Sequence, residues 1–153
     1  MTTILSRRYT HCPFSATIEL IERLHRSGAV HTVGPFSGLH TKVRCEFAET
    51  RDYTDQTRIH EALVVRWKAN SGTPMPVIRG MITVRPKGPA TEIRMRAKYR
   101  PLLGFEIFDS IVGRWLAQRT IDRFLDEVKK FVECEWAQER QMARYSVPAH
   151  APR

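Results

Sequence analysis

The sequence predicts an α+β fold in which helices gather on one face of an antiparallel sheet. A strand-like segment and a short amphipathic segment open the chain. Apolar residues then recur with the period of strands from about residue 29 to 99, and with the period of a helix over 105–141. Short turns between neighbouring strands favour an antiparallel meander with one apolar face and one face in water.

The first two elements are expected to be a strand over Thr2–Thr10 and a short helix after it. Pro13 suits the first turn of that helix, because the N–H that proline lacks would have no partner there. Gly28 provides a stop signal. The apolar residues of the helix recur at helical spacing, at Phe14, Ile18, Ile21 and Leu24.

Further strands are expected where apolar and polar residues alternate between residues 29 and 99. The turn signals Gly34-Pro-Phe-Ser-Gly38 and Pro86-Lys-Gly-Pro89 interrupt this alternation. The last strand shows the most regular alternation of all. The expected strands are Ala29–Phe36, Thr41–Phe47, His60–Lys68, Val77–Arg85 and Thr91–Tyr99.

A long helix is expected over Phe105–Gln141, where no proline interrupts the helical period. About 35 residues would make a helix of about 50 Å, which Gly113 can break or bend. A chain of 153 residues has the size of one domain, which we place over 1–141. The remainder, 142–153, has two prolines and little to pack, so a disordered tail is expected there.

The charge balance is the unusual feature of the composition. The chain has 25 Lys and Arg against 16 Asp and Glu, a net charge of +9. No apolar run is long enough to span a bilayer, and the first residues lack the apolar region of a signal peptide, so we expect a cytoplasmic protein. Cys12, Cys45 and Cys134 lack the spacing of a zinc site, and we expect three reduced, half-buried thiols.

Motifs that carry chemistry are missing from the sequence. It contains no Ser/His/Asp set, no HExxH, no P-loop and no GxGxxG. We therefore expect no metal and no cofactor, and enzymatic activity is not favoured. An enzyme that acts mainly by shaping its substrate with a few polar groups needs no such motif, so this class stays among the alternatives.

Several short segments together match the pattern of one known family. They are Pro13-Phe14-Ser15, His60-Glu61-Ala62-Leu63 with Trp67, Gly80 with Val84-Arg85-Pro86, Thr91-Glu92-Ile93, and Tyr99-Arg-Pro-Leu-Leu-Gly104 followed by Phe108-Asp109, Gly113-Arg114, Ala117 and Thr120. Over residues 2 to 140 the chain resembles the START-like helix-grip superfamily, also called SRPBCC, which includes polyketide cyclase-like proteins. The chain departs from the pattern at Leu102, where members carry a second proline.

The resemblance implies a helix-grip fold of the α+β class. In that fold a curved antiparallel sheet of about seven strands wraps around the long C-terminal helix, and a short N-terminal helix follows the first strand. Many members hold a hydrophobic or amphipathic molecule between the concave sheet face and the first half of the long helix. Because the family includes lipid-transfer domains, cyclases and plant hormone receptors, the resemblance is specific for fold and weak for function.

The alternation then assigns residues to the wall of this expected cavity, which would be apolar with a few polar points. A solid core with no room for a ligand fits the same pattern. Further inward residues of the same strands are Ile78, Gly80, Val84, Ile93 and Ala97. The candidate ligand-binding residues are Val43, Cys45, Phe47, Glu61, Leu63, Val65, Trp67, Ile82, Met95, Tyr99, Phe105, Phe108, Val112 and Leu116.

Two polar residues of this wall are weak catalytic candidates. Glu61 shares the parity of the apolar residues that follow it, and a buried carboxylate must find a partner or be protonated. It can then bind a ligand hydroxyl or amine, or act as a general acid or base. The Tyr99 hydroxyl can also reach a ligand. The plainer interpretations are a strand-end glutamate paired with an arginine and a tyrosine whose tip meets water.

Three functions fit these features. The first is binding of a hydrophobic or amphipathic small molecule, such as a lipid, without transforming it. The second is a polyketide-cyclase-like or dehydratase-like enzyme that uses Glu61 or Tyr99. The third is a basic module that docks on an anionic surface and has a filled core instead of a ligand cavity.

The strand residues that alternate with the inward ones are expected to place positive charge on the convex face of the sheet. A basic face attracts anionic membrane surfaces, nucleic acid or acidic proteins, and a solvated polar face is the plain alternative. Nucleic acid is not favoured, because single-strand binding needs interleaved aromatic residues. A weak contact with an anionic membrane surface is the expected partner beside the ligand. The face comprises Lys42, Arg44, Arg66, Lys68, Arg94, Arg96 and Lys98, with Arg79 and Arg85, and is diluted by Glu46 and Glu92.

Overall fold

The computed structural model describes residues 2–26, 32–33, 41–47, 62–70, 77–100 and 106–146. The elements in these ranges are β1 (Thr2–Thr10), α1 (Phe14–Arg26), β2 (Thr32–Val33), β3 (Thr41–Phe47), β4 (Ala62–Asn70), β5 (Val77–Lys87), β6 (Ala90–Arg100) and α2 (Glu106–Tyr145). The class is α+β, and the long C-terminal helix predicted from the sequence is present.

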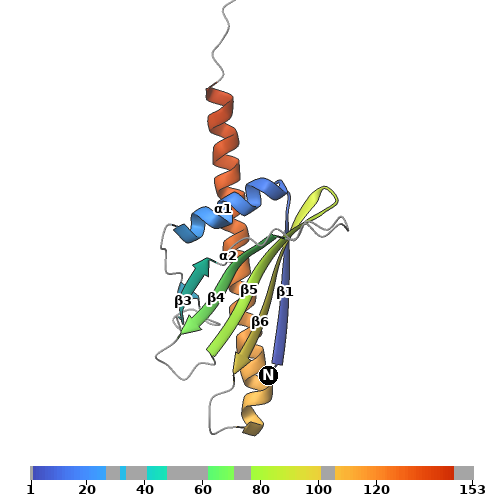
Figure 1. Ribbon diagram of the computed structural model, residues 1–153, viewed down its shortest axis with the longest axis vertical. Helices are drawn as coiled ribbons and strands as arrows, with labels where there is room; N and C mark the ends of the chain where they lie inside the picture. Colours follow the sequence, from blue (N-terminus) through green and yellow to red (C-terminus); the bar gives the residue numbers. More distant parts are fainter. Residues whose placement is uncertain are drawn as a thin grey trace, which may run out of the picture.

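The strands form one antiparallel sheet with the order β1-β6-β5-β4-β3-β2. The first strand therefore pairs with the last one, Thr2 opposite Tyr99 and Thr10 opposite Thr91. Gly88, at the turn between β5 and β6, has a φ of 59°, a left-handed conformation that glycine adopts without steric cost. Figure 1 shows α2 running along the sheet and projecting beyond it, with α1 crossing α2.

The predicted sheet of about seven strands wrapped around the long helix is wrong. In the described residues the sheet has six strands. Six segments of the sequence alternate like strands, and each overlaps one strand of the structure. The seventh strand came from the family resemblance and from no segment of this chain. Within the predicted strand Ala29–Phe36, the described part is the two-residue strand β2.

Helix α1 starts where proline was expected to start it. The Thr17 N–H donates to the Pro13 carbonyl at 2.9 Å, so Pro13 occupies the first turn, where a missing N–H costs nothing. The predicted apolar stripe of the helix packs against the core, because residues at this spacing share one helix face. Ile21 and Leu24 are buried together with Leu20, and Phe14 and Ile18 are partly buried.

Buried hydrogen bonds hold the turn between β1 and α1. The Thr91 hydroxyl of β6 donates to the Cys12 carbonyl at 2.7 Å. The Cys12 N–H donates to the Thr10 hydroxyl at 3.3 Å, and the Thr17 hydroxyl donates to the Pro13 carbonyl at 2.9 Å. The three threonines are buried, so the polar backbone groups of the turn have partners away from water.

Helix α2 has 40 residues and is therefore about 60 Å long. It continues past the predicted end, so residues 142–145 belong to the helix and not to the expected tail. Residues 138–144 are good helix formers, and Pro148, the first proline after them, disfavours helix at the preceding residue. The predicted tail residues 147–153 lie outside the described ranges. The buried apolar stripe is Ala117, Ile121, Phe124, Leu125, Val128 and Val132.

The alternation identified the inner face of β5 and β6 correctly. Gly80 lies on this face, where an added Cβ would come within 3.0 Å of the Ala97 Cβ and of the Met95 Cε. Close packing therefore leaves no space for a side chain at this position. The other residues predicted to point inward are all buried, namely Ile78, Ile82, Val84, Ile93, Met95, Ala97 and Tyr99.

A polar joint connects β1 to α2. The buried Ser6 hydroxyl donates to the Asp122 carboxylate at 2.5 Å, and the Gln118 amide donates to the same carboxylate at 3.2 Å. Arg8 donates through Nε to the Asp126 carboxylate at 2.5 Å and through Nη2 to the Asp122 carbonyl at 3.3 Å. Asp122 is thus the acceptor that the strand and the helix share.

Replacing Asp122 with alanine is expected to lower the free energy of unfolding by about 1–3 kcal/mol, because the buried Ser6 hydroxyl loses its acceptor. Asp126→Ala, one turn along the same helix, is the matched control. Its expected cost is at most about 1 kcal/mol, because Asp126 is exposed. Urea unfolding of both variants at neutral pH measures the difference, and equal losses would contradict a special role for Asp122.

Candidate functional site

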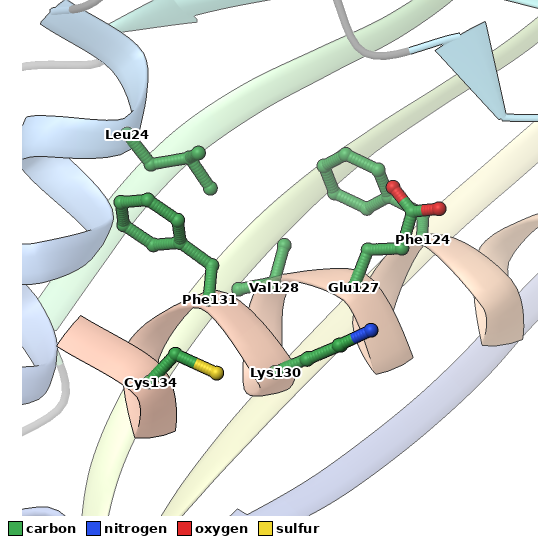
Figure 2. A pocket seen from close by; sticks show the side chains of 7 residues that line it. All are labelled: Leu24, Phe124, Glu127, Val128, Lys130, Phe131 and Cys134. Carbon is green, nitrogen blue, oxygen red and sulfur yellow. The ribbon is translucent and has the colours of Figure 1, made fainter. Parts of the chain in front are cut away.

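A groove opens between α1 and α2, with a volume of about 310 Å³. Figure 2 shows the groove from close by, with α1 on one side and α2 along its length. It lies where the two helices cross, on the inner side of the sheet. The described residues that line it are Leu24, Phe124, Glu127, Val128, Lys130, Phe131 and Cys134.

The wall of the groove is apolar. Figure 2 shows the side chains of Leu24 and Phe131 approaching one another from the two helices, with Val128 beside them. Phe124, Val128 and Phe131 share one face of α2, because they are four and three residues apart. Phe124 and Val128 are buried, and Phe131 is partly buried against them. The floor of the groove is therefore an edge of the hydrophobic core.

The rim of the groove carries polar groups from α2. Glu127, Lys130 and Cys134 line it and are exposed. A carboxylate and an ammonium group thus lie beside an apolar wall. An apolar wall with a few polar groups is the usual composition of a site for a small molecule, because the wall supplies affinity and the polar groups fix orientation.

The described lining of the groove includes none of the residues predicted to bind a ligand. Ile82, Met95 and Tyr99 are buried in the core, with Tyr99 only 3% exposed. On α2, Val112 is 48% exposed and Leu116 is partly buried. The predictions for Glu61 and Phe105 lie outside the described residues, as do those for the side chains of Val43, Cys45, Phe47, Leu63, Val65, Trp67 and Phe108.

The register of the sheet nevertheless brings several of the predicted positions into line. Antiparallel pairing of β3, β4, β5 and β6 aligns them in rows that run across the four strands. The alternation in each strand is therefore in phase with that of its neighbours over this part of the sheet. Two such rows are Phe47–Val65–Ile82–Met95 and Cys45–Trp67–Gly80–Ala97.

One position falls out of this phase, because the register of β4 shifts between Leu63 and Val65. Leu63 pairs with Thr83, whereas Val65 pairs with Ile82. The sequence predicted an unbroken alternation here, with Leu63 and Val65 at the same parity. A bulge inserts one extra residue into a strand, and a run of apolar residues over 63–65 hides such an insertion.

The helical periods in the sequence predicted two helices but no groove between them. A signal for the groove was nevertheless present, since α2 has adjacent apolar residues at Phe131 and Val132. Val132 is buried in the core, whereas Phe131 is only partly buried and lines the groove. An apolar stripe that is wider than one packed face needs therefore marks the helix face beside the groove.

The remaining chemistry of the described residues is limited. They include no group of three or more His, Cys, Asp or Glu side chains arranged to hold a metal ion. Within the same ranges, no helix combines the length and the apolar character that crossing a membrane requires. Cys12 and Cys134 are free thiols, but Cys12 is buried and Cys134 is exposed, whereas both were predicted to be half-buried.

A separate charge cluster surrounds Glu92 on the outer side of the sheet. Its side chain is 0% exposed, whereas the sequence placed it as a simple diluent of the basic face. Arg85 Nη2 lies 3.2 Å from both carboxylate oxygens, and Arg94 Nε lies 3.0 Å from Oε1. Burial by itself raises the pKa of Glu92, but the hydrogen bonds and positive charges of Arg85 and Arg94 bring that pKa below its ordinary value.

Comparison with solved structures found a similar fold in the crystal structure of TTHA0849 from Thermus thermophilus. The TM-score is 0.55 and the identity is 14%, and the match covers 88% of this chain and 99% of that chain. At this identity the likeness shows a shared fold alone. No protein-family model matches the chain, and no match was found among curated proteins.

The two described thiols are expected to react with a maleimide at different rates. Cys134 is exposed, whereas burial raises the pKa of the Cys12 thiol above its ordinary value, so less reactive thiolate is present at any given pH. Labelling at neutral and at alkaline pH, followed by peptide mass mapping, should modify Cys134 first and Cys12 only at the higher pH. Equal labelling of the two at neutral pH would contradict the burial of Cys12.

Glu92→Gln is expected to lower the free energy of unfolding by about 2 kcal/mol at neutral pH, because it weakens the charged hydrogen bonds to Arg85 and Arg94. Since the folded-state pKa of Glu92 lies below the ordinary 4.5, this stabilisation is present above pH 4.5 and is lost as the pH falls through the folded-state pKa. The difference between wild type and variant should therefore shrink in acid.

Glu133→Gln is the control for this experiment, because Glu133 is exposed and pairs with Lys129 on α2. Its expected effect is within about 0.5 kcal/mol at any pH. Chemical unfolding at a series of pH values between neutrality and acid measures both variants. A loss for Glu92→Gln that is as small as the control, or that stays constant in acid, would show that the buried carboxylate does not act through its charge.

Proposed function

We propose that the protein binds a hydrophobic or amphipathic small molecule, such as a single-chain lipid, in the groove between α1 and α2. The observation that supports this proposal is the apolar wall of Leu24, Phe124, Val128 and Phe131 beside a charged rim. Apolar surface at the edge of a core is stabilised when a ligand removes it from water, by about 25 cal/mol per Å². The charged rim favours a ligand with one polar end.

The size of the groove narrows the class of ligand. Its volume of about 310 Å³ lies at the small end of the range of ligand pockets, about 300–1,000 Å³. One alkyl or isoprenoid chain, or a small ring system, suits this volume better than a lipid with two chains. The open side of the groove leaves room for a polar head to remain in water.

Binding without transformation fits the groove better than catalysis. Its ionisable groups are Glu127, Lys130 and Cys134, which are exposed at the rim, whereas catalytic groups act most strongly in a site that excludes water. Of the two catalytic candidates, Tyr99 lies in the described residues, and it is buried on the inner face of the sheet.

The proposal places the protein in the cytoplasm. Kinship with the START-like superfamily stays a prediction from the sequence.

Native mass spectrometry of the purified protein, compared with denaturing conditions, shows whether a ligand co-purifies with the chain. The open site is then titrated with a dansyl-labelled undecanoic acid, whose fluorescence rises on entering an apolar site. Phe131→Ala should weaken this binding about tenfold, because it removes part of the apolar contact. Cys134→Phe should weaken it by narrowing the rim without disturbing a buried position.

Met142→Ala is the matched control, because Met142 is an exposed apolar residue on the same helix outside the described lining. It should bind the fatty acid like the wild type. Circular dichroism of each variant checks that the fold is intact. The proposal fails if the wild type carries no ligand and does not bind the probe, or if both groove variants bind it as tightly as Met142→Ala does.

A further inference from the structure

The outer face of the sheet, away from α1 and α2, carries a patch of exposed positive charge. The patch, called the outer basic face below, consists of Arg7 on β1, Arg79 on β5, and Arg96 and Lys98 on β6, all exposed. In the described part of the chain no acidic side chain lies within ion-pair distance of these four residues.

Cross-strand pairing sets positive charges directly opposite one another. Arg79 pairs with Lys98, and Arg7 pairs with Arg94. The row through Arg79 continues in the register to Lys68 on β4 and from there to Arg44 on β3. Like charges directly opposite in a sheet destabilise it. A negatively charged partner outside the chain would offset the repulsion between Arg79 and Lys98.

The acidic residue Glu92 in this region is already neutralised by neighbouring arginines. Glu92 lies on the same side of β6 as Arg94 and Arg96, but its carboxylate is buried and bonded to Arg85 and Arg94. Lys87 adds a third cation at 3.7 Å. Glu92 therefore forms ion pairs with the cations at one end of the sheet, Arg85, Lys87 and Arg94. Arg79, Arg96 and Lys98, toward the other end, are left to face solvent.

Apolar side chains lie among these charges. Leu5 pairs with Arg96, and Arg96 pairs with Met81, so the row reads apolar, basic, apolar across three strands. Leu5 is 39% exposed and Met81 is 43% exposed. Charged groups that attract an anionic surface, with apolar side chains between them to enter it, are the combination by which proteins bind at membrane interfaces.

Nucleic acid fits this face less well. Single-stranded nucleic acid requires aromatic rings on which bases stack. On the described outer side Tyr9 is exposed, but Lys87 Nζ lies over its ring, 5.6 Å from the centroid. Leu5 and Met81 also offer nothing to a phosphate backbone, which is recognised by charge and hydrogen bonds. The observations therefore favour a lipid surface.

We propose that the outer basic face docks the protein on a membrane surface that contains acidic phospholipids. This inference goes beyond ligand binding in the groove, because it rests on the opposite side of the sheet. It does not require the groove to be occupied. In the docked orientation the cations of β5 and β6 meet the headgroups, Leu5 and Met81 enter the interfacial layer, and both helices face the aqueous phase.

The test is co-sedimentation of the full chain with vesicles of phosphatidylcholine, with and without phosphatidylserine. The wild type is expected to sediment with the acidic vesicles alone, and to be released by salt because the Debye length shortens. The variant Arg79→Gln/Arg96→Gln/Lys98→Gln should bind about a hundredfold more weakly, since each of the three cations contributes about a fivefold gain near an acidic surface.

The variant Arg26→Gln/Arg140→Gln/Arg144→Gln is the matched control, because it removes the same number of charges from exposed positions on the two helices. It should bind like the wild type. Leu5→Ser/Met81→Ser should weaken vesicle binding but leave retention on heparin unchanged. Equal losses in the two arginine-containing triple variants, binding to neutral vesicles, or a preference of the wild type for RNA over acidic vesicles would overturn the proposal. These readouts do not depend on the fatty-acid probe, so failure here and failure of the groove are distinguishable.

Discussion

The pairing of the first strand with the last fixes most of this architecture. Because β1 lies beside β6 over nine register positions, the helix that follows β6 has to return along the inner face close to β1. The Ser6–Asp122 hydrogen bond joins α2 to that strand, beside the apolar residues that pack the helix against the core. The helix that follows β1 has to cross α2, and the groove forms at this crossing because two rounded helix surfaces leave a wedge that side chains fill only in part.

Periodicity in the sequence predicted what depends on neighbours along the chain. It identified both helices, the strand segments and the buried parity of β5 and β6. It missed the register shift after Leu63, because the apolar run over 63–65 conceals an inserted residue. It also missed the burial of Glu92, which depends on Arg85 from the neighbouring strand. Such features arise from pairing between segments, which no local pattern contains.

The candidate site shows the same division between local and non-local information. The residues of its wall are visible in the sequence as apolar stripes, but the crossing of α1 over α2 that turns them into a groove is not. The family resemblance directed attention to the first half of the long helix, where Val112 is in fact half-exposed. The groove lies about three turns further along the same helix, at Phe124 to Cys134.

The opposed positive charges of the outer sheet face have a consequence for how the fold responds to its surroundings. Cross-strand pairs such as Arg79 and Lys98 repel one another in the folded chain, and the chain relaxes that repulsion when it unfolds. Any anion that settles between them offsets the repulsion, and it stabilises the native state in proportion to the logarithm of its concentration. Folding and anion binding are therefore thermodynamically linked. The melting temperature rises with the concentration of any anion that binds the outer sheet face.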